Sequence, residues 1–153
     1  MGLLNFLFGK TNKLEHPFFG TLVFYEDKKN ASQSYFSGSK NFKPSGKPIE
    51  VIIVAKVTGP TPKQTAFFQS IEDNYKTISE SIIPLIENEF SNWQEDFKIT
   101  NFQKEFEPVC LNIPNCENEP ITWEIAFESV HDLNHTFTLT MRNLEAFDIL
   151  IDG

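Results

Sequence analysis

Apolar and polar residues alternate along the last third of the chain. Every second residue is apolar from Ile121 to Phe127 and again from Phe137 to Met141. A period of two is typical of a strand that buries one face and exposes the other. The pattern predicts strands over 121–128 and 136–142, joined as a hairpin by 129–135, and a final strand over 147–151.

Shorter apolar runs predict strands in the rest of the chain as well. Residues 20–25, 33–37 and 49–56 are rich in β-branched and aromatic residues, and a further run over 109–113 ends at Pro114. The segment 51–55 is apolar at every position, which is expected of a strand with both faces covered. We therefore place 49–56 near the centre of a sheet.

Between these strands the apolar period changes to that of a helix. Thr61 and Gln64 have the spacing of a capping box, and Pro62 occupies the first helical position. Steps of three and four then predict one long helix to Phe90, with a kink or break at Pro84. The apolar stripe consists of Phe67, Ile71, Tyr75, Ile78, Ile82, Leu85 or Ile86, and Phe90.

A second capping pattern at Ser91 predicts a short helix through Phe97. Taken together, the elements predict a single α+β domain over residues 1–153. It consists of a mainly antiparallel sheet of about six to seven strands packed on one long central helix, in the order β-β-β-α-β-β-β-β. The sixteen phenylalanines indicate a bulky aromatic core, with an aromatic binding surface as the alternative.

Charge is distributed unevenly along the chain. Residues 1–76 carry ten lysines and six acidic residues, whereas residues 77–153 carry three basic and fifteen acidic residues, within a total of −8. Such a negative field disfavours nucleic acid and attracts cationic partners, although acidic residues also serve solubility alone. A lysine-rich stretch is the one candidate patch for nucleic acid: Lys28, Lys29, Lys40, Lys43 and Lys47.

Residues with catalytic potential are present without a specific motif. Cys110 and Cys116 are expected to be reduced thiols, with a local disulfide as the alternative, and His131 and His135 fall in a predicted turn. We predict no metal site and no cofactor. A small hydrolase stays open as an alternative, using Cys110 or one of three carboxylate pairs, which are Glu87/Glu89, Glu105/Glu107 and Glu117/Glu119.

The chain begins with a short apolar segment, residues 1–12. It is far shorter than the roughly 20 residues of a membrane-spanning helix, so no integral membrane segment is predicted. The segment is expected to dock on the domain. A peripheral adaptor that touches a membrane surface through it is the alternative.

Three segments together resemble small bacterial domains of unknown function. They are His16–Leu22, the stretch Gly59–Gln64 and the ending Phe147–Gly153. Domains of this kind are often encoded beside secreted toxins and are suspected immunity proteins. The resemblance implies a cytoplasmic, non-enzymatic protein that neutralises a cognate toxin by direct binding.

The least regular part of the sequence is the expected contact region for such a partner. Irregular surface segments often carry binding residues, and an acidic surface would suit a basic toxin such as a nuclease. The predicted partner-binding residues are Glu95, Asp96, Glu105, Glu107, Glu117 and Glu119. The oligomeric state is left open.

Overall fold

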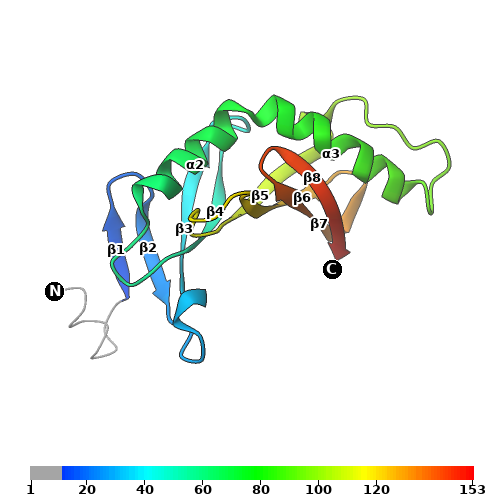
Figure 1. The fold of residues 1–153 in the computed structure, drawn as a ribbon. Helices are drawn as coiled ribbons and strands as arrows, with labels where there is room; N and C mark the ends of the chain where they lie inside the picture. Colours follow the sequence, from blue (N-terminus) through cyan, green and yellow to red (C-terminus); the bar gives the residue numbers. More distant parts are fainter. Residues whose placement is uncertain (1–11) are drawn as a thin grey trace.

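The computed structural model describes residues 12–153 as one eight-stranded sheet with two main helices along one face (Figure 1). The predicted apolar segment falls almost entirely on residues 1–11, which lie outside the described part. The strands follow one another across the sheet in chain order: β1 (Lys13–His16), β2 (Gly20–Tyr25), β3 (Tyr35–Phe42), β4 (Lys47–Val54), β5 (Phe106–Ile113), β6 (Thr122–Ser129), β7 (Asp132–Arg142) and β8 (Glu145–Asp152).

The sheet is mixed because of a single crossover. All neighbouring strands are antiparallel except β4 and β5, which are parallel. A parallel pair needs a long connection, and here helices α2 (Pro62–Asp73) and α3 (Tyr75–Phe90) provide it. The chain therefore forms two four-stranded meanders, β1–β4 and β5–β8, joined side by side. The α+β class is confirmed, while the predicted strand number was too low because β1 was missed.

The prediction of one long central helix was wrong. Its start is confirmed, because Thr61 and Gln64 form the capping box. The helix breaks at Asn74, where the backbone leaves helical geometry and the side-chain amide donates to the Ser70 carbonyl, 2.8 Å away. Pro84 lies inside α3 instead of breaking it. Its ring is exposed, so water can hydrate the Glu80 carbonyl that the missing N–H leaves free.

The predicted helix over 91–97 is a series of turns. Ser91 ends α3, and its hydroxyl donates backward to the Asn88 carbonyl, 2.6 Å away, so it is not available to cap a new helix. A four-residue helix, α4 (Phe102–Glu105), forms further on. Asn101 starts it by accepting from the Lys104 N–H, a capping role that the sequence analysis did not identify.

The core lies between the helices and the sheet, and it is strongly aromatic. Eleven phenylalanines are buried, which confirms the core interpretation of the phenylalanine content. Phe68 of α2 packs edge-on against Phe19 and Phe42 of the first meander. Phe90 of α3 stacks on Phe137 of the second meander, with ring centroids 5.4 Å apart. The contacts also cross between the halves, because Phe67 of α2 packs edge-on against Trp123 of β6 and Tyr75 of α3 packs edge-on against Phe42 of β3.

Gln64 ties the two meanders together where the parallel strands end. Its side chain is buried, and its amide nitrogen donates to the Val54 carbonyl (2.7 Å) and the Pro114 carbonyl (2.8 Å). Its amide oxygen accepts from the Thr61 N–H at 3.0 Å. One glutamine therefore caps α2 and bridges the ends of β4 and β5.

Candidate binding surface

One face of the sheet is left uncovered by the described residues (Figure 1). Residues that pair directly across neighbouring strands point to the same side of a sheet, so the register identifies the side chains on this face. One row crosses all eight strands: Lys13, Val23, Ser37, Ile52, Asn112, Glu124, Thr140 and Asp148. We call this side the open face.

The open face is predominantly acidic. Its basic residues are Lys13 on β1 and Arg142 on β7. Its acidic residues, again by register, are Glu15, Glu50, Glu107, Glu124, Glu128, Glu145, Asp148 and Asp152. Six of these eight come from the second meander, so the negative charge gathers on β5–β8.

The first meander contributes apolar and aromatic surface to the open face. Tyr25 and Tyr35 stack with ring centroids 5.1 Å apart, and Tyr25 is 48% exposed. Val23, Ile52 and Val54 lie beside them and are only partly buried. An apolar area next to an acidic area, with no helix over either, has the composition of a surface for another macromolecule.

Cys110 lies at the seam between the two areas. Burial, and then the charges of Glu50 and Glu124, raise the pKa of its thiol to about 11. Cys116 is free as well, and burial together with Glu117 and Glu119 raises its pKa to about 11. Because the thiolate is the reactive form, neither thiol is prepared as a nucleophile at neutral pH.

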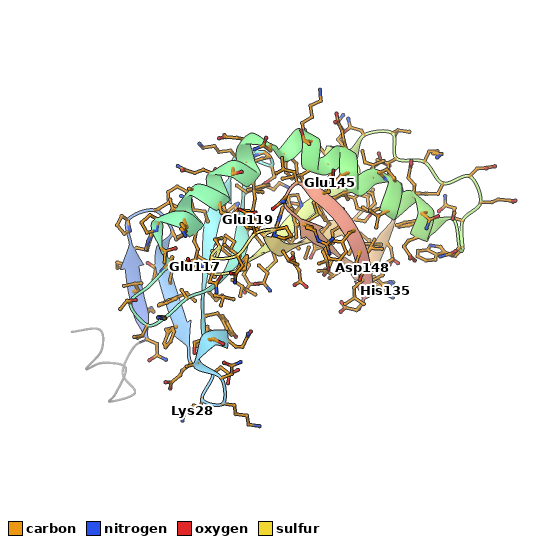
Figure 2. The ribbon with its side chains drawn as sticks, in the orientation of Figure 1. Lys28, Glu117, Glu119, His135, Glu145 and Asp148 are labelled. Atoms are coloured by element: carbon orange, nitrogen blue, oxygen red, sulfur yellow. The ribbon has the colours of Figure 1, made fainter. Side chains whose placement is uncertain are left out.

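The six predicted partner-binding acids do not form one surface. Glu95 and Asp96 are exposed in the turns after α3. Only Glu107 lies on the open face by register, and it pairs at 2.8 Å with Lys47, the first residue of β4, whose register places it on the other side of the sheet. Glu117 and Glu119 lie past the other end of β5, about 25 Å further along the strand. Figure 2 shows them beside α2, and Glu117 pairs with Lys63 of that helix at 3.1 Å.

Glu105 has a structural position. Its carboxylate, with a side chain only 12% exposed, accepts from the backbone N–H groups of Thr100 and Asn101 and contacts His131 Nε2 at 2.7 Å. Burial raises its pKa, but these hydrogen bonds outweigh burial and hold the pKa below the ordinary value. The expectation that an irregular segment leaves its acids free is wrong here, because Glu105 closes the loop before α4.

The carboxylate pairs do not have the geometry of the hydrolase alternative. Residues two apart share a side only in a strand, and none of the three pairs lies within one. Glu87 and Glu89 are in α3, and Glu117 and Glu119 are in the loop after β5. Glu105 is the last residue of α4, whereas Glu107 is in β5. Of the three pairs, Glu117 and Glu119 both lie near the Cys116 thiol, where their charges raise its pKa.

The predicted turn position is right for His131 but wrong for His135, which lies within β7, and the two histidines contact different acids. His131 contacts Glu105, and His135 Nδ1 contacts Asp132 at 2.7 Å. Within residues 12–153, no three histidine, cysteine or acidic side chains gather at the spacing of a metal site. Residues 12–153 therefore contain no such group of metal ligands.

The lysine-rich stretch is dispersed by the fold. Lys28 and Lys29 are in the connection from β2 to β3, and Figure 2 shows Lys28 at the tip. Lys43 and Lys47 lie at the other end of β3. Lys40 lies over the Phe18 ring, 4.0 Å from its centroid, and donates to the Phe18 carbonyl. The five lysines therefore form no continuous patch.

The open-face acids were present in the predicted strands but were not recognised as a set. Glu124 and Glu128 alternate with buried residues in β6, and this alternation predicts only that they lie on the solvent side of a hairpin. Each strand reveals its own polar side. The pairing order that places Glu50, Glu124 and Asp148 on one face is a tertiary property, so it could not be read from strand patterns.

Comparison of the chain with protein families, curated proteins and solved structures finds no match. Across residues 12–153, none of the helices combines the length and apolar character needed to cross a bilayer.

Proposed function

We propose that this protein binds a basic protein partner through the open face of its sheet. The observation that carries the proposal is the composition of that face, where acidic side chains of β5–β8 adjoin exposed aromatic and aliphatic side chains of β2–β4. Acidic residues steer a cationic partner during encounter, and the apolar area supplies the contacts that hold the bound complex together. The partner expected from this chemistry is basic with an apolar patch of its own.

An immunity role is the form of this function that we propose. A basic toxin, such as a nuclease, has the charge that the open face would attract, and binding alone would neutralise it. This role requires no catalytic group, cofactor or metal, and it places the protein in the cytoplasm with the toxin's target. Of the six predicted acids, Glu107 belongs to the proposed contact and Glu105 supports the loop before α4, whereas Glu95, Asp96, Glu117 and Glu119 lie off the open face.

A pair of charge-reversal variants tests the proposal. Glu124→Lys/Glu128→Lys changes two exposed open-face residues of β6, whereas Asp73→Lys/Glu80→Lys changes two exposed helix residues by the same total charge. The partner to use is the secreted protein encoded beside this gene. At low ionic strength, association should slow by about 10-fold or more for the first variant and far less for the second. High salt should shrink the difference.

Growth protection gives the functional readout. Cells that produce the neighbouring protein should survive with the parent and with Asp73→Lys/Glu80→Lys, and less well with Glu124→Lys/Glu128→Lys. Equal slowing by both variants would show that total charge, not the open face, controls binding. If the parent neither binds nor protects against the neighbouring gene product, the immunity role is wrong.

A further inference from the structure

The second half of strand β8 forms a free edge of the sheet. Within residues 12–153 the only strand that β8 pairs with is β7, along the eight residues from Glu145 to Asp152. Its first part is covered by α3, because the Ala146 N–H donates to Ser81 Oγ at 3.1 Å, so the free part runs from Asp148 to Asp152. The opposite edge strand, β1, has four residues. A strand edge presents backbone N–H and C=O groups that can pair with another extended segment. Sheets commonly recognise peptides by accepting them as an added strand.

One hydrogen bond identifies the outward-facing backbone groups of β8. The Ile149 N–H donates to the Asp148 carboxylate of the same strand, 2.9 Å away. We take this N–H to point away from β7, since a side chain of its own strand satisfies it. Backbone groups alternate between the two edges of a strand, so Ile151 presents its N–H and C=O to the same side. A docking strand could form hydrogen bonds with the outward backbone groups of Ile149 and Ile151, which would free the Asp148 carboxylate for the partner.

A pocket of about 550 Å³ lies beside this edge. Trp93, which follows α3, is 55% exposed and rests on Phe90 with ring centroids 5.1 Å apart. Leu150 is 60% exposed. Glu89, Asp132 and His135 also line the pocket, and the Asp132 carboxylate contacts His135 Nδ1 at 2.7 Å. An exposed indole with carboxylates around it suits a guanidinium or ammonium group, which gains from both the ring face and the charge.

We propose that the β8 edge accepts an extended basic segment of the partner as a ninth strand, with an arginine or lysine of that segment in the pocket beside Trp93. The inference rests on the proposed function for the sign of the partner's charge. A second copy of this chain fits the edge poorly. β8 carries Glu145, Asp148 and Asp152 and no basic residue, so two copies would bring like charges together across the new pair.

Synthetic peptides of about eight residues, the usual length of a strand, provide the probe. The first alternates arginine with threonine. The second has the same sequence with N-methyl groups on every backbone nitrogen, so that it keeps its charge but has no N–H to donate along either edge. The third replaces arginine with glutamate. Binding of labelled peptides to the full chain is followed by fluorescence anisotropy, and amide exchange at Ile149 and Ile151 by NMR.

The arginine peptide should bind and slow exchange of the Ile149 and Ile151 amides, while the glutamate peptide should not bind. N-methylation should weaken binding by about 10-fold or more, because the backbone bonds are lost. Trp93→Ala should weaken it by roughly 5-fold or more through the lost cation–π contact. Val57→Ala is the matched control, since Val57 is an exposed apolar residue outside the pocket (44% exposed), and it should leave affinity unchanged.

Equal binding of the arginine and N-methylated peptides, or unchanged exchange at Ile149 and Ile151, would overturn the inference. So would a parent dimer in which those two amides are already protected, because a second copy would then occupy the edge. Binding of the neighbouring protein, measured beside binding of the peptide, separates this inference from the proposed function. Peptide binding that persists while the neighbouring protein fails to bind the parent would remove the immunity role and leave the β8 edge as a binding site.

Discussion

The two meanders have the same strand order and opposite charge. Residues 13–54, which contain β1–β4, carry six lysines and four acidic residues, whereas residues 106–152, which contain β5–β8, carry one arginine and nine acidic residues. Both bury their helix-facing side chains equally well. The difference is therefore confined to surface positions, which contribute little to folding and much to recognition. Under the proposed function, the first meander is mainly scaffold and the second is the recognition half.

The two meanders are also joined along one shared pair of strands. They share one continuous sheet through β4 and β5, and Gln64 bridges the ends of these two strands. A continuous sheet and core predict that both meanders unfold together, although their surfaces differ. The stability predictions below test this point, beginning with the largest effect.

Removing a core anchor from either helix should destabilise the whole domain. Phe68, under the first meander, and Ile82, in α3, are both fully buried. We expect Phe68→Ala to cost about 4 kcal/mol and Ile82→Ala about 3 kcal/mol, from lost burial and the cavities left behind. Urea unfolding followed by far-UV circular dichroism and by tryptophan fluorescence measures both.

The probes distinguish one cooperative unit from two. The two tryptophans are Trp123, which is 2% exposed in β6, and Trp93, which is 55% exposed after α3, so the emission reports on the second meander and on the contact of Trp123 with Phe67 of α2. The two signals should give the same midpoint in each variant. A Phe68→Ala protein whose fluorescence midpoint stays at the parent value while its circular dichroism midpoint falls would show that the meanders unfold separately.

Gln64 should have the next largest effect. Gln64→Leu keeps the side-chain bulk but leaves the carbonyls of Val54 and Pro114 without their donor. Unsatisfied buried groups of this kind cost about 1–3 kcal/mol each, and relaxation offsets part of the sum, so we expect a loss of about 3 kcal/mol. Chemical unfolding measures it. Gln69→Leu, at an exposed position of the same helix, is the control and should change stability little.

The sequence predicted local structure well where one pattern dominated. The β2 bounds and the Thr61 capping box are confirmed because short-range chemistry determines them. The break at Asn74 and the continuity through Pro84 were missed, since exposure of Pro84 and the Asn74 bond to Ser70 depend on how the helices lie on the sheet. The four-residue β1 was missed because Lys13–His16 is too short to show a period.

The candidate surface was harder to predict for the same reason. The excess of acid in the second half was visible in the sequence, but its location was attributed to irregular segments. Glu105 shows why acids in such segments are hard to assign: a carboxylate in a loop is also the group best placed to satisfy the backbone N–H groups of that loop. The strands, whose patterns seemed purely structural, carry the acids that gather on the open face.

The Glu105 carboxylate should stabilise the recognition half in a pH-dependent way. Its pKa is lowered in the folded protein, so its contribution is present above the unfolded value of about 4.3 and is lost as pH falls through the lower folded pKa. Glu105→Gln should cost about 1–2 kcal/mol at neutral pH through weakened charge-assisted hydrogen bonds. The difference between parent and variant should shrink below about pH 4.

Unfolding free energies of parent and variant from pH 7 down to pH 3 measure this difference. Taking the difference removes the contribution of the other carboxylates, which titrate in both proteins. Glu107→Gln is the matched control, because Glu107 lies two residues on and its pair with Lys47 is exposed. A Glu105→Gln protein whose deficit stays constant from pH 7 to pH 3 would contradict the assigned origin of the lowered pKa.

The smallest predicted effect concerns the seam between the meanders. Burial sets most of the rise in the Cys110 pKa, and Glu50 of the first meander and Glu124 of the second add to it. Replacing either acid with glutamine should lower the pKa modestly and raise the thiolate fraction, so alkylation by iodoacetamide should quicken by roughly 2-fold to 3-fold. Peptide mapping by mass spectrometry after timed alkylation gives the rate for each thiol.

Cys116 serves as an internal control in the same molecules. Its pKa is raised by burial and by Glu117 and Glu119, and neither substitution touches those groups. Its rate should therefore stay at the parent value while that of Cys110 rises. Comparable acceleration from Glu50→Gln and Glu124→Gln would show that both meanders contribute charge to one continuous surface. Acceleration by Glu124→Gln alone would confine the negative field to β5–β8, and the open face would then divide at β4.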